Sequence, residues 1–153
     1  MTRGPAALPR RHVLTLPTIP GAVRVARQTA EMTFSDWGIS LAHPAVGPAL
    51  LVLSELVTNS VRHAAVLSPQ TTITYAAGED TLAFAVHDRH PYRPPLCGPV
   101  AAGGDGGGLA TVTELVLGLG GTAVVRPDAD GNGKSVWITL PLQRAARERR
   151  ERT

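Results

Sequence analysis

The sequence has a single cysteine, Cys97, among 153 residues, so it lacks the pair of thiols that an intrachain disulfide requires. It also lacks any run of about 18 apolar residues, the length that a membrane-spanning helix needs. Residues 1–11 are rich in proline and arginine and contain no apolar segment of the kind found in secretory signal peptides. These absences predict a cytoplasmic protein that makes no contact with a membrane.

Positive charge is scarce between the two ends of the chain. Residues 1–11 and 144–153 each carry a net charge of +3, and the whole chain carries +3, so residues 12–143 sum to −3. Nucleic-acid binding needs lysines and arginines clustered on a folded face, where they displace counterions. We therefore expect no direct binding of nucleic acid, and we interpret the basic ends as solvated tails.

Length and composition predict one domain with short tails. A chain of 153 residues with 43% hydrophobic content is long and apolar enough for one buried core. We divide it into a disordered N-terminal arm (residues 1–10), a folded domain (11–142) and a basic C-terminal tail (143–153).

Sequence periodicity predicts an α+β fold. Apolar residues at helical spacing predict helices over residues 20–37, 49–64 and 109–119, the first ending at Gly38. Alternating or β-rich runs predict strands over residues 11–16, 71–76, 81–87, 122–126 and 135–140. Because helices and strands do not alternate, we expect a two-layer α/β sandwich with a mostly antiparallel mixed sheet covered on one face by helices. Trp37 and Trp137 are expected in its core.

The helix over residues 49–64 carries a polar side. With Glu55 at zero, a rotation of about 100° per residue places Asn59 near 40° and Arg62 near 340°, opposite an apolar stripe near 190°. A solvated face explains this arrangement. A site for a ligand explains it as well, because Leu51 and Val52 suggest that the helix is covered on both sides.

Glycines precede the last predicted helix. Residues 88–108 form a long segment dense in proline and glycine that ends in Gly103-Gly-Asp-Gly-Gly-Gly108. Glycines let backbone N–H groups approach a ligand closely, and a helix N-terminus favours an anion, so this segment indicates a phosphate site. A flexible linker is the alternative.

Other residues point to specific chemistry less directly. Asp88 ends an apolar strand, where its carboxylate can accept a hydrogen bond from an exocyclic amine such as that of adenine; a turn aspartate is the alternative. Gly133-Lys-Ser135 is similar to the end of a Walker A loop, but a strand follows it, so that motif fails. The histidines lack the spacing of a zinc site, and Cys97 has no predicted base beside it.

Taken in order, these segments resemble the GHKL ATPase superfamily, which has the histidine kinase-like ATPase fold. The stretch from Glu55 to Ala64 (ELVTNSVRHA) is the specific part, followed by Asp88, by Gly106-Gly-Gly-Leu109 and by Gly133-Lys-Ser-Val-Trp137. Within the superfamily, the chain resembles the small ATP-binding regulators related to anti-sigma-factor serine/threonine kinases.

The resemblance implies a role for each matching residue. Glu55 is the implied general base, and Asn59 the implied Mg²⁺ ligand. Asp88 is implied to bind the adenine amine, with Ser135 standing where the family usually has a threonine near that aspartate. The remaining implied ATP-binding positions are Arg62, His63, Gly106, Gly107, Gly108 and Leu109. Of these, Gly106, Gly108 and Leu109 are implied to form the hinge and start of a lid over the phosphates.

Two of the chain's departures from the superfamily pattern concern the expected ATP site. The Asp-x-Gly-x-Gly box is absent, because Arg89, His90 and Pro91 follow Asp88. Gly107 replaces the arginine of the usual Gly-Arg-Gly-Leu, which removes a cation that could contact phosphate. These changes affect catalysis more than nucleotide binding.

The function implied by the resemblance is transfer of the ATP γ-phosphate to a serine or threonine of a small antagonist protein, with ATP and Mg²⁺ as cofactors. Sequestration of a sigma factor and formation of a homodimer are further implications. The alternative is a non-catalytic ATP-binding module that presents a surface to a partner protein.

Overall fold

The computed structural model describes residues 8–91 and 107–142. In these residues the chain forms β1 (Arg10–Pro17), α1 (Gly21–Asp36), α2 (Val46–Ala64), β2 (Gln70–Ala77), β3 (Thr81–Asp88), α3 (Gly107–Gly118), β4 (Thr122–Pro127) and β5 (Lys134–Pro141). Each matches an element predicted from periodicity, with ends that differ by at most three residues. The expected arm and tail fall largely outside the described residues, at 1–7 and 143–153.

The strands form one five-stranded sheet in the order β1-β2-β3-β5-β4. Every strand pairing in the described part of the chain is antiparallel, as expected for the predicted α+β sandwich. The pairing between β3 and β5 places Asp88 opposite Lys134 and His87 opposite Ser135. This register determines which residues at the end of β3 share a face of the sheet.

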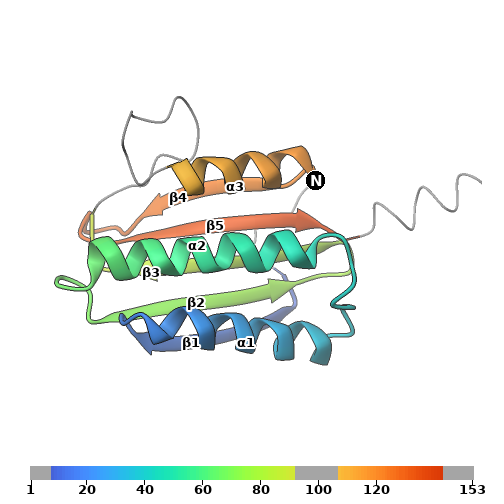
Figure 1. The fold of residues 1–153 in the computed structure, drawn as a ribbon, viewed down its shortest axis with the longest axis horizontal. Coiled ribbons are helices and arrows are strands. Elements are labelled where there is room, and N and C mark those ends of the chain that lie inside the picture. Colours follow the sequence, from blue (N-terminus) through green and yellow to red (C-terminus); the bar gives the residue numbers. More distant parts are fainter. Residues whose placement is uncertain (1–7, 92–106, 143–153) are drawn as a thin grey trace, which may run out of the picture.

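The three helices lie on one face of the sheet (Figure 1). The central helix α2 packs on β3 with α1 and α3 on either side, α1 lying over β1 and β2 and α3 over β4 and β5. The core between the layers is built from alternate residues of the strands, including Ile73, Phe84, Val86, Ile138 and Leu140. The two-layer arrangement predicted from the element order is confirmed.

Tyr75 joins the two layers. Its ring is fully buried, packs edge-on against Phe34 with ring centroids 6.1 Å apart, and its hydroxyl donates a hydrogen bond to the carbonyl of Ala26 in α1 (2.7 Å). Burial disfavours the phenolate and raises the pKa of Tyr75 far above its ordinary value.

The expectation that both tryptophans lie in the core is wrong for Trp137. Trp37 packs against the core at the end of α1, but Trp137 lies between Val136 and Ile138, which both point into the core. Because side chains alternate along a strand, Trp137 points to the face without helices. The large apolar side chain of Trp137 favoured a prediction of burial. The alternation of side chains along β5 instead places it on the face without helices.

Two glycines are required by the backbone around the helices. Gly38 follows α1 with φ 78°, a left-handed conformation that ends the helix as predicted. Gly121 lies where the chain turns from α3 into β4, and a Cβ there would come within 2.2 Å of the Thr139 carbonyl oxygen. Only glycine fits this close approach of β4 to β5.

Candidate functional site

The polar side of α2 is positioned by packing on both flanks of the helix. Val52 and Leu56 are buried because α1 and α3 enclose α2, so only a narrow strip of the helix faces outward. Glu55 and Asn59 lie on that strip one turn apart, and both are half-buried. The sequence led us to expect that α2 is covered on both sides, because Leu51 and Val52 lie near its polar side. Val52 is buried as expected, whereas Leu51 is 44% exposed.

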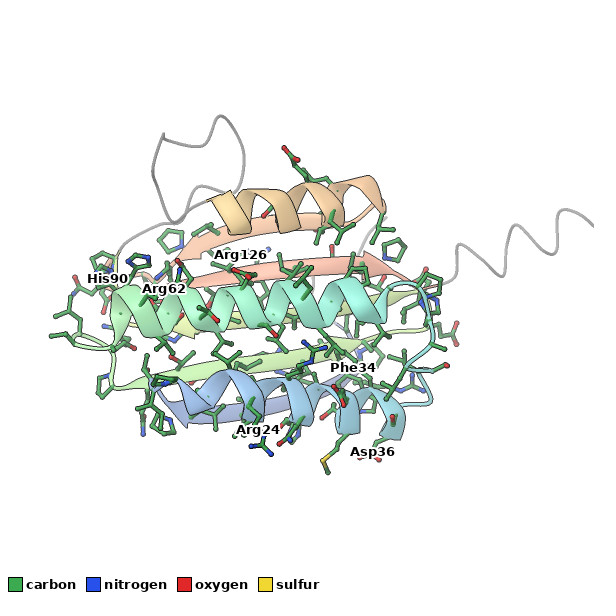
Figure 2. The ribbon with its side chains drawn as sticks, viewed as in Figure 1. Arg24, Phe34, Asp36, Arg62, His90 and Arg126 are labelled. Carbon is green, nitrogen blue, oxygen red and sulfur yellow. The ribbon has the colours of Figure 1, made fainter. Side chains whose placement is uncertain are left out.

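Arg62 and His63 continue this side in the last turn of α2, and both are exposed. Figure 2 shows Arg62 and His90 at the same end of the molecule, where α2 and β3 finish. A positive side chain at a helix C-terminus interacts favourably with its partial negative charge, so Arg62 also stabilises the end of α2.

Asp88 is the buried centre of the site. Its side chain is only 2% exposed, at the end of β3 beneath α2. The hydroxyl of Ser60 donates to Oδ2 (2.7 Å), and the backbone N–H of His90 donates to Oδ1 (3.1 Å). Ser60 directly follows Asn59 in α2, so the outward polar strip and the buried carboxylate are held in one rigid arrangement.

Lys134 pairs with Asp88. Its Nζ lies 2.6 Å from Oδ1 of Asp88 and 3.3 Å from the carbonyl oxygen of His90, and its side chain is 5% exposed. An ion pair so deeply buried is kept only where hydrogen bonds satisfy both charges, as they do here. Lys134 thus supplies a positive charge beside the carboxylate that was expected to bind adenine.

Ser135 does not reach Asp88. Its Cα pairs with that of His87, and the two side chains share the face of the sheet away from the helices. The structure therefore brings Lys134 to the position near Asp88 that the resemblance implied for Ser135. The reason is the two-residue period of β5, which turns neighbouring side chains to opposite faces.

An ionic network joins the β4–β5 turn to the end of β3. Asp128 accepts hydrogen bonds from Arg89 (2.6 Å to Oδ2) and contacts Nε2 of His87 (2.9 Å), while Arg89 also bonds Asp130 (2.7 Å). The Arg89 guanidinium lowers the pKa of Asp130. The turn that carries Lys134 into β5 is therefore held against β3 by charge pairs.

Gly133 allows this turn to approach Asp88. A Cβ at Gly133 would lie 2.3 Å from Oδ2 of Asp128 and 2.8 Å from the backbone oxygen of Asp88. No side chain fits in that space. The glycine of the Gly-Lys-Ser segment thus serves the packing of the turn.

The glycine segment is partly described. Helix α3 begins at Gly107, so Gly107, Gly108 and Leu109 form its first turn, consistent with a helix N-terminus that follows the glycines. Gly106 and Cys97 lie outside the described residues. The first-turn N–H groups of a helix are suited to an anion, which is the chemistry predicted for this segment.

The available groups suit a nucleotide better than a metal alone. Among the residues that the structure describes, no group of three His, Cys, Asp or Glu side chains is placed to hold a metal ion. Mg²⁺ commonly takes one or two protein oxygens and completes its shell with phosphate oxygens and water. The amide oxygen of Asn59 fits such a shared site.

Two of these residues were missed by sequence reasoning. Ser60 was missed because a polar residue is expected on the outer side of a helix, whereas Ser60 lies on the buried side of α2 and is 4% exposed. Lys134 falls within the failed phosphate-loop motif and within the Gly133-Lys-Ser-Val-Trp137 segment of the resemblance, but neither assigns it a role. The alternation of Val136, Ile138 and Leu140 was a usable signal for Lys134, because residues of that parity face the core.

The family described as histidine kinase-, DNA gyrase B-, and HSP90-like ATPase matches residues 47–144, which is more than half of the chain. None of the curated proteins matches. Within the described residues, no helix has the length and apolar character needed to cross a membrane.

Two solved structures are similar. The crystal structure of the RsbU and RsbW domains of Rv1364c from Mycobacterium tuberculosis matches over 87% of this chain and 32% of that one, with 20% identity and a TM-score of 0.62, which indicates the same fold. A histidine kinase domain of the blue-light activated histidine kinase of Erythrobacter litoralis EL346 matches over 64% of this chain and 45% of that one, with 28% identity and a TM-score of 0.46. The chain thus spans less than half of each.

Proposed function

Because the chain belongs to the family of histidine kinase-, DNA gyrase B- and HSP90-like ATPases, we propose that it binds Mg²⁺-ATP and transfers the γ-phosphoryl group to a serine or threonine of a small partner protein. The observation that carries the proposal is the placement of Glu55 and Asn59 on the outward strip of α2, with Ser60 beside them bonded to the buried Asp88.

Each group has a part in this reaction. Asp88 accepts a hydrogen bond from the base, Asn59 helps to hold Mg²⁺ at the phosphates, and the N–H groups at the start of α3 face the phosphate oxygens. The metal supplies neutralisation of phosphate charge. Arg62 and His63 lie at the rim of the same end, where Arg62 adds positive charge.

Glu55 acts as the general base. The acceptor hydroxyl oxygen forms a bond to the γ-phosphorus, the bond between that phosphorus and the β–γ bridging oxygen breaks, and ADP leaves. The hydroxyl proton passes to the Glu55 carboxylate. Phosphoryl transfer depends mainly on positioning and charge neutralisation, so one carboxylate, one metal ligand and a set of N–H groups are sufficient.

The proposed partner follows from the resemblance to anti-sigma-factor kinases. The phosphate acceptor is an antagonist of an anti-sigma factor, and the same chain binds a sigma factor. A homodimer is the proposed assembly, and the cytoplasm the proposed location.

The competing function is a non-catalytic ATP-binding module that presents a surface to a partner. The Lys134–Asp88 ion pair favours it, because three hydrogen bonds already occupy the Asp88 carboxylate. Gly107 also leaves no side-chain cation at the start of α3.

Isothermal titration with a non-hydrolysable ATP analogue, with and without Mg²⁺, tests the nucleotide site. We expect Mg²⁺-dependent binding that is weakened in Asp88→Ala and Asn59→Ala but kept in Asn132→Ala, which removes an amide from the exposed β4–β5 turn. Absence of binding at millimolar nucleotide contradicts the proposal. Transfer of labelled γ-phosphate to a partner decides between the kinase and the non-catalytic module.

A further inference from the structure

Leu51 is an apolar residue on the otherwise polar outward strip of α2. It lies one helical turn before Glu55, about 6 Å away along the helix axis and about 40° around it. Its side chain is 44% exposed, although Val52 beside it is buried. The proposed general base therefore has a solvent-exposed leucine as its neighbour, on the side opposite to Asn59.

The last turn of α3 lies at the same end of the helix layer as the start of α2. The His43 ring bonds the carbonyl oxygen of Leu142 and accepts the N–H of Ala45, directly before α2, so α2 begins beside the end of β5. A Cβ on Gly121, which follows α3, would lie 3.0 Å from Cδ2 of Leu140, also at the end of β5. The two helices pack against each other and run antiparallel (Figure 1).

Helix α3 adds further apolar surface at this end. Glu114 is its single charged residue, and Leu115 and Leu117 are 39% and 48% exposed. Each of these leucines lies about 100° around the helix from the buried Val116, so one of them is on the flank toward α2. A helix that is apolar on more than its core side is normally covered, which indicates that another molecule contacts this surface.

The position of Leu51 identifies the molecule that covers it. A hydroxyl that reaches the Glu55 carboxylate brings the neighbouring residues of its own chain over Leu51. Side chains two positions apart in an extended segment share a face and are about 7 Å apart, and residues one helical turn apart are about 6 Å apart. Both spacings match the rise between Leu51 and Glu55, so the acceptor chain places a second side chain on the leucine.

We propose that Leu51 is a specificity-determining residue for the phosphate acceptor and selects an apolar side chain close to the accepting serine or threonine. That side chain lies two positions away in an extended acceptor or one turn away in a helical one. An apolar residue there removes the leucine from water, whereas a charged residue would lose its own hydration. The inference rests on the proposed function, because it requires Glu55 to receive the acceptor hydroxyl.

Twelve-residue peptides with one central serine test this selection. Four sets carry leucine, alanine, lysine or glutamate at the positions two, three and four residues from the serine on both sides. Single-turnover transfer from labelled Mg²⁺-ATP is measured with the full chain for the wild type, Leu51→Lys and Leu67→Lys. Leu67 is the matched control, because it is 59% exposed and lies beyond the other end of α2. Thermal unfolding verifies that each variant is folded.

We expect the wild type and Leu67→Lys to phosphorylate the leucine set at least about fivefold faster than the alanine set, and the two charged sets more slowly still. Leu51→Lys should lose the preference for leucine and favour the glutamate set over the lysine set, because its ammonium group attracts a carboxylate.

Three results overturn the inference. Equal transfer to all four sets by the wild type, or a preference for leucine that persists in Leu51→Lys, does so while the kinase proposal stands. Transfer to none of the peptides also does so, because every claimed contact lies within the length of one peptide. A wild type that does not bind Mg²⁺-ATP in calorimetry is a separate result, which removes the proposed function and the inference with it.

Discussion

The hydroxyl of Ser60 lies 2.7 Å from Oδ2 of Asp88 and ties the inner side of α2 to the end of β3. Both side chains are almost fully buried. Asn59, on the outward strip, directly precedes Ser60, so this hydrogen bond links the helix segment that carries Asn59 to the carboxylate beneath it.

Ser60→Ala is expected to lower both stability and nucleotide affinity. A hydrogen bond to a buried carboxylate contributes about 1.5–3 kcal/mol, and its loss leaves Asp88 with less compensation for its charge. Urea unfolding measures the first effect and titration calorimetry the second. Ser54→Ala is the control on the same helix, since Ser54 bonds only the carbonyl of Leu50 (2.8 Å); an equal loss of affinity in that variant contradicts the assigned role.

Glu55→Gln is expected to separate chemistry from binding. The amide keeps the size of the side chain but cannot accept the hydroxyl proton, so phosphoryl transfer should fall by about 10²–10⁴-fold with little change in nucleotide dissociation constant. Single-turnover transfer of labelled phosphate measures this. Glu31→Gln removes a carboxylate from α1 and should transfer at the wild-type rate. Unchanged transfer by Glu55→Gln eliminates the general-base assignment.

Tyr75→Phe is expected to change how the free energy of unfolding depends on pH above pH 10.0. The folded-state pKa of Tyr75 is raised above its unfolded value of 10.0, so its stabilisation is fully present below pH 10.0 and is lost as the pH rises above that value. At pH 7, loss of the bond to Ala26 should cost about 1 kcal/mol. Above pH 10.0 the difference in free energy of unfolding between the wild type and Tyr75→Phe should shrink. Urea unfolding at several pH values measures this difference. A difference that stays constant with pH contradicts the burial of the phenol.

Gly121→Ala is expected to destabilise the domain by about 3 kcal/mol, because its Cβ would meet the Thr139 carbonyl oxygen at 2.2 Å and Val116 Cγ1 at 2.9 Å. Gly118→Ala is the matched control, since nothing lies within 4 Å of a Cβ there, and its effect should stay within about 1 kcal/mol. Thermal unfolding compares the two. Similar stabilities would show that β4 can move away from β5.

The fold was largely predictable because its elements carry strong local patterns. The apolar stripe of α2 and the alternation of β5 indicate which side of each element faces the core, and Gly38 marks the end of α1 by the backbone that it alone adopts easily. The order of the strands in the sheet could not be predicted from these local patterns. Pairing of β3 with β5 skips β4, and it depends on contacts between residues far apart in sequence.

The site was predictable for Glu55, Asn59 and Asp88 as residue types, but their surroundings were not. Whether Asp88 offers a bare carboxylate or an ion pair depends on the register between β3 and β5. A shift of one residue would place Ser135 opposite Asp88 in place of Lys134, which would remove the positive charge beside the carboxylate. Local patterns carry no information on that register until the strands are paired.

Among the residues that the structure describes, β1 and β4 are the two edges of the sheet, each with a row of backbone groups that pairs with no further strand. Both edges carry residues that oppose such pairing. β1 opens with Arg10 and Arg11 and ends at Pro17, and β4 ends with Arg126 and Pro127. Charge repels a second edge and proline offers no N–H to it, so the sheet is protected from edge-to-edge aggregation at both margins.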